Sequence, residues 1–127
     1  MKTGYLFITT AIVEFMTGFA LILFPSLTAE ILLGLPISTI TGTTVGRVAG
    51  AALISLAVAF WLARNDEQSN AAKGLIVAML LYNITVMGIL AYTVIALVFT
   101  VVLLLVLITH FALTAWCIYA LQKAMRN

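Results

Sequence analysis

Long apolar runs, interrupted at only a few points, dominate the sequence. One run extends from Tyr5 to Phe24 and stops before Pro25, and a second extends from about Val45 to Ala63. The second run ends at the only clearly hydrophilic stretch of the chain, Arg64 to Lys73. A helix needs roughly 20 residues to cross ~30 Å of hydrocarbon at ~1.5 Å per residue. The pattern therefore predicts membrane-spanning helices at 5–24 and 45–63.

A third apolar run, Gly74 to Gln122, contains no Asp, Glu, Lys or Arg. As a single helix it would be roughly 73 Å long, more than twice the thickness of the membrane core. The run must therefore fold back on itself, and Gly88 is one of its few turn signals. We predict spans at about 74–91 and 97–121, with a tight turn near 91–96.

The connection after the first span, Pro25 to Pro36, is longer than a turn requires. Its leucines and isoleucine recur at roughly helical spacing between two prolines, at Leu27, Ile31, Leu32 and Leu35. Ser26 is available as a helix cap. This pattern predicts a short helix in the outer membrane interface, and an irregular apolar loop is the alternative.

The composition agrees with a membrane location. Of the 127 residues, 65% are hydrophobic and only 8% are charged, and the mean hydropathy is +1.25. A soluble domain of this size would need more polar surface. We therefore expect an all-α membrane protein, a single domain over 1–127 built as a four-helix transmembrane bundle with a short extracytoplasmic interfacial helix.

Charge and cysteine content narrow the possible partners. The net charge of +2, without a block of like charges, gives no indication of nucleic-acid binding. The single cysteine, Cys117, cannot form an intrachain disulfide, and no Cys/His cluster has metal-ligand spacing. We expect no metal site and no cofactor.

The positions of the basic residues predict the orientation. With four spans both chain ends lie on one side, and five of the six basic residues lie on that side: Lys2, Arg64, Lys73, Lys123 and Arg126. Only Arg47 does not. Basic residues are enriched in cytoplasmic segments. We therefore expect a multi-pass protein of the bacterial cytoplasmic (inner) membrane with both termini in the cytoplasm, and Trp61 near the cytoplasmic interface as part of an aromatic belt.

Glu14 lies in the middle of the first span, where an acidic residue costs something like 2.5–3.5 kcal/mol of insertion free energy. Helical spacing places Thr10, Thr17 and Gly18 near it on one face. A stripe of polar and small residues is expected to face other helices instead of lipid. Glu14 therefore needs a partner, or a proton, inside the bundle.

Polar residues at similar depth occur on two further spans. Tyr82 and Asn83 lie near the centre of the third span, and His110 begins an i, i+4, i+7 series with Thr114 and Cys117 on the fourth. Such groups usually contact one another in membrane bundles. For His110 we consider a structural hydrogen bond, a role in handling ligand or protons, and metal or heme ligation across a homodimer.

Arg47 has two competing interpretations. It lies ~10 Å by helical rise from the centre of the second span, so its long side chain is within reach of a midplane group. An ion pair with Glu14 would keep that carboxylate charged. The alternative is that Arg47 extends outward to the lipid headgroups, in which case Glu14 is expected to be protonated because desolvation disfavours its charge.

Three glycines, Gly42, Gly46 and Gly50, recur at four-residue spacing at the start of the second span. Small residues at this spacing let helix backbones approach closely. We interpret them as a helix-packing face within the bundle, with a homo-oligomer interface as the alternative.

In layout the chain resembles the DoxX-like group of small bacterial inner-membrane proteins. The resemblance covers most of the chain and rests on four short spans and short motifs: Leu33–Gly34, GRVAGAA (46–52), WLAR (61–64), Tyr82–Asn83 and the late His110. It implies a four-helix membrane fold, and some members of that group are linked to quinone-coupled redox systems. It assigns no catalytic residue.

These observations favour a protein that binds or transports a small amphipathic or lipid-like ligand at an intramembrane polar site. The expected ligand-binding residues are Glu14, Arg47, Tyr82, Asn83 and His110. The alternative is a non-catalytic accessory or structural subunit of a larger membrane complex. A quinone-linked or lipid-modifying enzyme has less support, because no nucleophile–base pair is present. The expected partners are membrane lipid and a homo-oligomer or larger membrane complex.

Overall fold

The computed structural model describes residues 3–66 and 69–126, so Lys2 lies outside the described residues. Within these ranges the chain is all-helical, and four of its five helices are long and apolar enough to cross a membrane. The helices are α1 (Thr3–Leu23), α2 (Pro25–Leu33), α3 (Ile40–Ala63), α4 (Asn70–Ala96) and α5 (Val101–Arg126). The expected all-α, four-helix architecture of a multi-pass membrane protein is confirmed.

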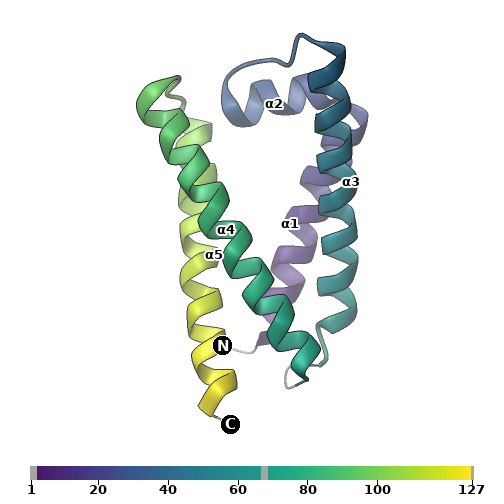
Figure 1. Ribbon diagram of the computed structural model, residues 1–127, viewed down its shortest axis with the longest axis vertical. Helices are drawn as coiled ribbons and strands as arrows, with labels where there is room; N and C mark the ends of the chain where they lie inside the picture. Colours follow the sequence, from purple (N-terminus) through teal and green to yellow (C-terminus); the bar gives the residue numbers. More distant parts are fainter. Residues whose placement is uncertain (1–2, 67–68, 127) are drawn as a thin grey trace.

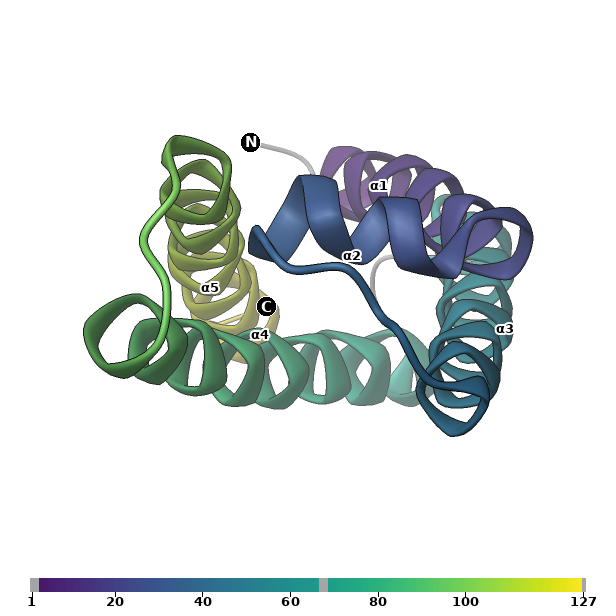
Figure 2. The same ribbon diagram turned by 90° about the horizontal axis from the view of Figure 1, so that it is seen from above.

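The four long helices form two antiparallel pairs. α1 packs along α3, and α4 packs along α5, whereas contacts between the pairs are much fewer. Figure 1 shows the two pairs meeting near the end that carries both chain termini and diverging toward the end covered by α2. Seen from above, in Figure 2, the four long helices surround the centre of the molecule, α2 runs beside α1 toward α5, and the connection from α2 to α3 passes over the centre.

The main hydrophobic core lies in the half of the bundle nearer the termini, where the pairs meet. It contains residues from all four long helices, among them Phe7, Phe60, Ile76 and Cys117. The rings of Phe7 and Phe60 stack with their centroids 6.1 Å apart. This core holds the two pairs together. Side chains one helical turn farther from the termini therefore lie at a common depth on the different helices.

The backbones of α1 and α3 pack closely along their seam because glycines of the two helices face one another there. A Cβ atom placed on Gly50 would lie 2.6 Å from the carbonyl oxygen of Gly18, and one on Gly18 would lie 2.6 Å from that of Gly50. The other two glycines of the series differ: Gly46 faces Pro25, and Gly42 faces Ile37 and the capping hydroxyl of Thr39. The glycine series thus packs α3 against α1 at one position and against the preceding segment elsewhere.

The expected boundaries around α4 and α5 need correction. The turn predicted near 91–96 is helical, because α4 continues through Ala96 and the chain reverses at 97–100. The carbonyl of Thr93 accepts from both Leu97 and Val98 and so ends the helix. The hydroxyl of Thr100 accepts from the backbone N–H of Leu103 and begins α5.

Two further helices begin earlier than the hydrophobic pattern indicates. α3 starts at Ile40 instead of 45, because the Thr39 side chain caps it by accepting from the N–H of Gly42. α4 starts at Asn70 instead of 74, capped by Ser69 through the N–H of Ala72. Polar caps extend both helices beyond their apolar segments.

The short helix expected between the prolines is present as α2, within the predicted segment 25–36. Pro25 occupies its first turn, but Ser26 is not its cap: the N-cap is Phe24, without a side-chain bond. Gly34 ends it in the left-handed region at φ 81° and lies against Thr100. Because α2 contacts α1, α3 and α5, it spans both helix pairs at one end of the bundle.

Candidate functional site: an intramembrane polar layer

The candidate site is a layer of polar side chains directly beyond the hydrophobic core. Glu14 follows the core residue Ala11 on α1, Asn83 follows Met79 on α4, and His110 precedes Leu113 on α5. In each case the polar residue is about one helical turn from the core residue, on the same helix face. These side chains therefore lie at one depth, where the helix pairs begin to diverge.

Asn83 and His110 are held in this layer by hydrogen bonds. Asn83 is completely buried, and its amide nitrogen donates to the carbonyl oxygen of Met79 at 2.8 Å. Its side-chain oxygen is thereby directed to the ring of His110, where Oδ1 and Nδ1 are 2.8 Å apart. This geometry assigns the donated proton to Nδ1 and leaves Nε2 as the free nitrogen of the ring.

Nε2 of His110 makes no hydrogen bond with a residue in the described part of the chain. The backbone carbonyl of His110 accepts from the hydroxyl of Thr114 one turn later, at 2.8 Å. The i, i+4 series noticed in the sequence thus satisfies Thr114 within its own helix. The imidazole itself keeps one nitrogen available for another group.

Glu14 is the unpartnered member of the layer. Only 4% of its surface is exposed, yet its carboxyl forms no hydrogen bond or ion pair with any residue in 3–66 or 69–126. Among the described residues, no fully enclosed side-chain nitrogen or oxygen lacks a hydrogen-bond partner. The carboxyl oxygens of Glu14 are therefore not fully enclosed by the protein, and a polar group of another molecule can reach them.

Tyr82 lies beside His110 in the layer. Its ring packs edge-on against the imidazole of His110, with centroids 6.0 Å apart and planes at 68°. Tyr82 and His110 thus lie together on the α4–α5 pair, whereas Glu14 comes from the α1–α3 pair.

Thr10 contributes to the core side of the layer. It is completely buried, and its hydroxyl donates to the sulfur of Met79 at 3.4 Å. Because the Met79 carbonyl also accepts from Asn83, this methionine connects α1 to the Asn83–His110 pair. The polar stripe predicted on the first span thus faces the other helices at Thr10 and Glu14.

Arg47, the fifth expected ligand residue, is not part of this layer. Its Nε donates to the backbone carbonyl of Ile22 at 3.3 Å, two helical turns beyond Glu14 on α1. The ion pair with Glu14 therefore does not form. Arg47 instead places its charge at the C-terminal end of α1, where carbonyl groups lack helical partners and cations are favoured.

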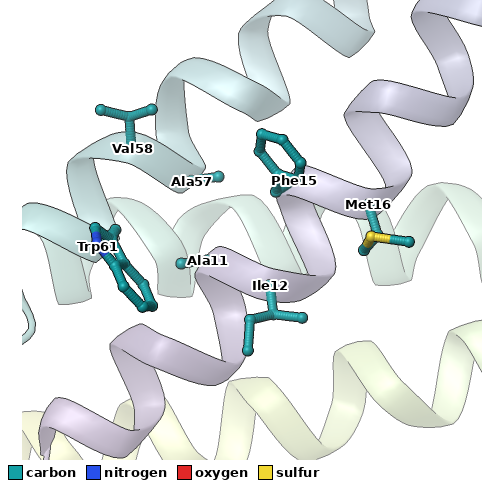
Figure 3. A pocket seen from close by; sticks show the side chains of 7 residues that line it. All are labelled: Ala11, Ile12, Phe15, Met16, Ala57, Val58 and Trp61. Carbon is teal, nitrogen blue, oxygen red and sulfur yellow. The ribbon is translucent and has the colours of Figure 1, made fainter.

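An apolar groove on the α1–α3 seam escaped the sequence analysis. It has a volume of about 480 Å³ and is lined by Ala11, Ile12, Phe15, Met16, Ala57, Val58 and Trp61. Figure 3 shows the small side chains of Ala11 and Ala57 between the larger ones of Phe15 and Trp61. Its only sequence signal was the presence of alanines among bulky residues on two spans.

The described residues contain no group of three or more His, Cys, Asp or Glu side chains placed to hold a metal ion. No protein-family model, curated protein or solved structure matches the chain. The resemblance to DoxX-like proteins therefore stays a prediction, and functional inference rests on the geometry of the polar layer.

Proposed function

We propose that the protein binds a small amphipathic or lipid-like molecule at the polar layer, with the ligand's polar group against Glu14 and His110. The observation that carries this proposal is the carboxyl of Glu14, which belongs to a residue only 4% exposed and has no hydrogen-bond partner among the described residues. An unsatisfied buried polar group is costly. A ligand that bonds to it removes that cost and so gains affinity.

The chemistry of the layer indicates the type of ligand. Nε2 of His110 accepts a hydrogen bond when its ring is neutral, and a carboxyl group accepts or donates according to its protonation. A hydroxyl or amino group satisfies both residues. Tyr82 adds an aromatic wall beside the imidazole. We therefore propose a ligand with a hydroxyl or amino group attached to an apolar tail.

This proposal is tested by identifying small molecules that remain bound to the full chain after purification in a mild detergent. Organic extraction and mass spectrometry measure the amount of ligand per protein for wild type, Glu14→Gln and His110→Ala. We expect both substitutions to reduce the retained ligand at least about tenfold, which corresponds to a loss of ~1.4 kcal/mol of binding free energy.

Thr109→Ala is the matched control on α5. Thr109 is next to His110, but its hydroxyl bonds only to the Leu105 carbonyl of its own helix. This variant is expected to retain the wild-type amount of ligand. Circular dichroism establishes that each variant keeps its helix content. Equal ligand retention in Glu14→Gln, His110→Ala and wild type would contradict the proposal.

We also propose that the protein resides in the bacterial cytoplasmic membrane with both termini in the cytoplasm. Arg64, Lys73, Lys123 and Arg126 lie at the end of the bundle where the chain termini lie, and this charge distribution supports the orientation. To test the orientation, buried Cys117 is replaced by alanine and a single cysteine is introduced at Asn70 or at Ser38. In intact spheroplasts, a membrane-impermeant maleimide is expected to label the variant with cysteine at position 38 and not the variant with cysteine at position 70. Labelling of the position-70 variant only would show the opposite orientation.

A further inference from the structure

The apolar groove on the α1–α3 seam is separate from the polar layer. Successive residues of a helix are ~100° apart around its axis. The mean direction of the α1 residues that line the groove is therefore roughly 130° from the direction of Glu14. Phe15, next in sequence to Glu14, is exposed and forms part of the groove wall, whereas Glu14 is buried. The groove therefore lies on the outer surface of the bundle, between two membrane-spanning helices.

One end of the groove carries a positive charge. Trp61 forms the groove wall near the end of α3, and the guanidinium carbon of Arg64 lies 4.4 Å from the centroid of the Trp61 ring. An Nη1 hydrogen bond to the Trp61 carbonyl also holds Arg64 in place. A guanidinium with further N–H donors is thus fixed beside an entirely apolar channel.

We propose that this groove binds one molecule of an anionic glycerophospholipid. One acyl chain lies against Ala11 and Ala57, and the phosphate group accepts hydrogen bonds from Arg64. An apolar lining within membrane-spanning helices matches an acyl chain, and a volume of about 480 Å³ falls within the usual range for small-molecule sites. Arginine at the membrane interface complements the charge of anionic headgroups.

The size of the groove favours a lipid over a second copy of the chain. Seven residues line it, whereas stable protein interfaces use roughly 20–30 residues on each side. The small residues at its floor leave a channel between protruding side chains, which suits a flexible chain better than a helix. Association of two copies through this face is retained as an outcome of the test.

Native mass spectrometry of the detergent-purified full chain tests the proposal. The probes are dioleoyl phosphatidylglycerol and dioleoyl phosphatidylcholine, which differ in headgroup charge but share the same acyl chains. Wild type is expected to retain the anionic lipid about fivefold more than the neutral lipid, as one arginine near the membrane surface predicts. Equal retention of the two lipids by wild type would overturn the proposal.

Two matched pairs of variants locate the site. Arg64→Gln is expected to bring the ratio of the two lipids close to one, and Lys123→Gln, which removes the same charge on α5, is expected to leave it unchanged. Val58→Trp fills the groove from its rim and is expected to reduce retention of both lipids at least about tenfold, the size of effect that one ill-fitting apolar group produces. Val48→Trp changes an exposed valine of α3 outside the groove lining and is expected to retain lipid normally.

Several results would overturn the assignment. If Arg64→Gln retained the two lipids in the wild-type ratio, Arg64 would not be the residue that contacts the phosphate. If Val58→Trp retained normal amounts of both lipids, the groove would not be the binding site. A dimer that dissociates in Val58→Trp but not in Val48→Trp would assign the face to a second copy. Glu14→Gln is expected to keep the lipid ratio of wild type, so failure of the polar-layer proposal and failure of this one are distinguishable.

Discussion

The side-chain oxygen of Asn83 lies 2.8 Å from Nδ1 of His110 and joins the centres of α4 and α5. Interhelical hydrogen bonds inside membranes contribute roughly 0.6 kcal/mol on average and up to roughly 1.7 kcal/mol in double-mutant cycles. We expect a coupling free energy in this range between Asn83→Ala and His110→Ala. Reversible unfolding in mixed micelles measures it.

Thr109 supplies the control for this coupling. Its hydroxyl bonds within α5, so a cycle between Asn83→Ala and Thr109→Ala is expected to show a coupling free energy close to zero. A coupling of similar size in both cycles would mean that Asn83 acts on α5 as a whole and not through the imidazole of His110.

The contact between Gly18 and Gly50 predicts a steric effect on stability. Alanine at position 50 places its methyl group against the Gly18 carbonyl oxygen, 2.6 Å away before relaxation. We expect Gly50→Ala to lower the free energy of unfolding by about 1–3 kcal/mol. The measurement is the unfolding midpoint followed by circular dichroism in micelles.

Gly88→Ala is the matched control, because nothing lies within 4 Å of a Cβ atom at position 88. Alanine stabilises a helix interior relative to glycine by about 0.5–1 kcal/mol. Gly88→Ala is therefore expected to raise stability slightly. If both alanine variants changed stability in the same direction, close packing at Gly50 would not be the cause.

Glu14 is expected to limit stability and to support binding. Leucine favours the membrane interior, whereas an acidic group at the midplane costs about 2.5–3.5 kcal/mol. Because Glu14 has no hydrogen-bond partner among the described residues, we expect Glu14→Leu to unfold no more easily than wild type while losing the retained ligand. Unfolding in micelles and mass spectrometry of extracted ligand measure the two effects. A strongly destabilised Glu14→Leu protein would show that the carboxyl has a structural role.

Arg47 is expected to act on the end of α1 and not on the ligand. Arg47→Met removes the hydrogen bond to the Ile22 carbonyl and is expected to cost about 0.5–1.5 kcal/mol of unfolding free energy. The amount of bound ligand in purified protein should equal that of wild type. A loss of ligand as large as that of Glu14→Gln would place Arg47 back in the binding site.

Much of the fold follows from the sequence because the bilayer imposes a length on each apolar run. The four spans were predicted on that basis, and the short helix between the prolines was predicted from the helical spacing of its apolar residues. The boundaries depended on single polar side chains instead. Thr39, Ser69 and Thr100 begin helices by accepting backbone N–H groups, and such bonds are invisible to a count of hydrophobic residues.

The polar layer was predicted in part because depth follows from position along a helix. That reasoning placed Glu14, Asn83 and His110 at one level, and the structure brings their elements together there. For Arg47 the sequence offered two partners, Glu14 and the lipid headgroups. The residue bonds to neither of these but to the backbone carbonyl of Ile22 at the end of α1. The groove was missed because it depends on which side chains of α1 and α3 meet, and on the space left between them.

The division into two helix pairs has a consequence for how the chain assembles in the bilayer. The bond between Asn83 and His110 lies entirely within the α4–α5 pair, and the Gly18–Gly50 contact lies within the α1–α3 pair. These contacts are therefore complete within each pair and need nothing from the other pair. The hydrogen bond from Thr10 to the Met79 sulfur and the shared hydrophobic core, in contrast, form only when the two pairs associate. Association of the two pairs is therefore the step that completes the buried core and brings Glu14 beside the depth of Asn83 and His110.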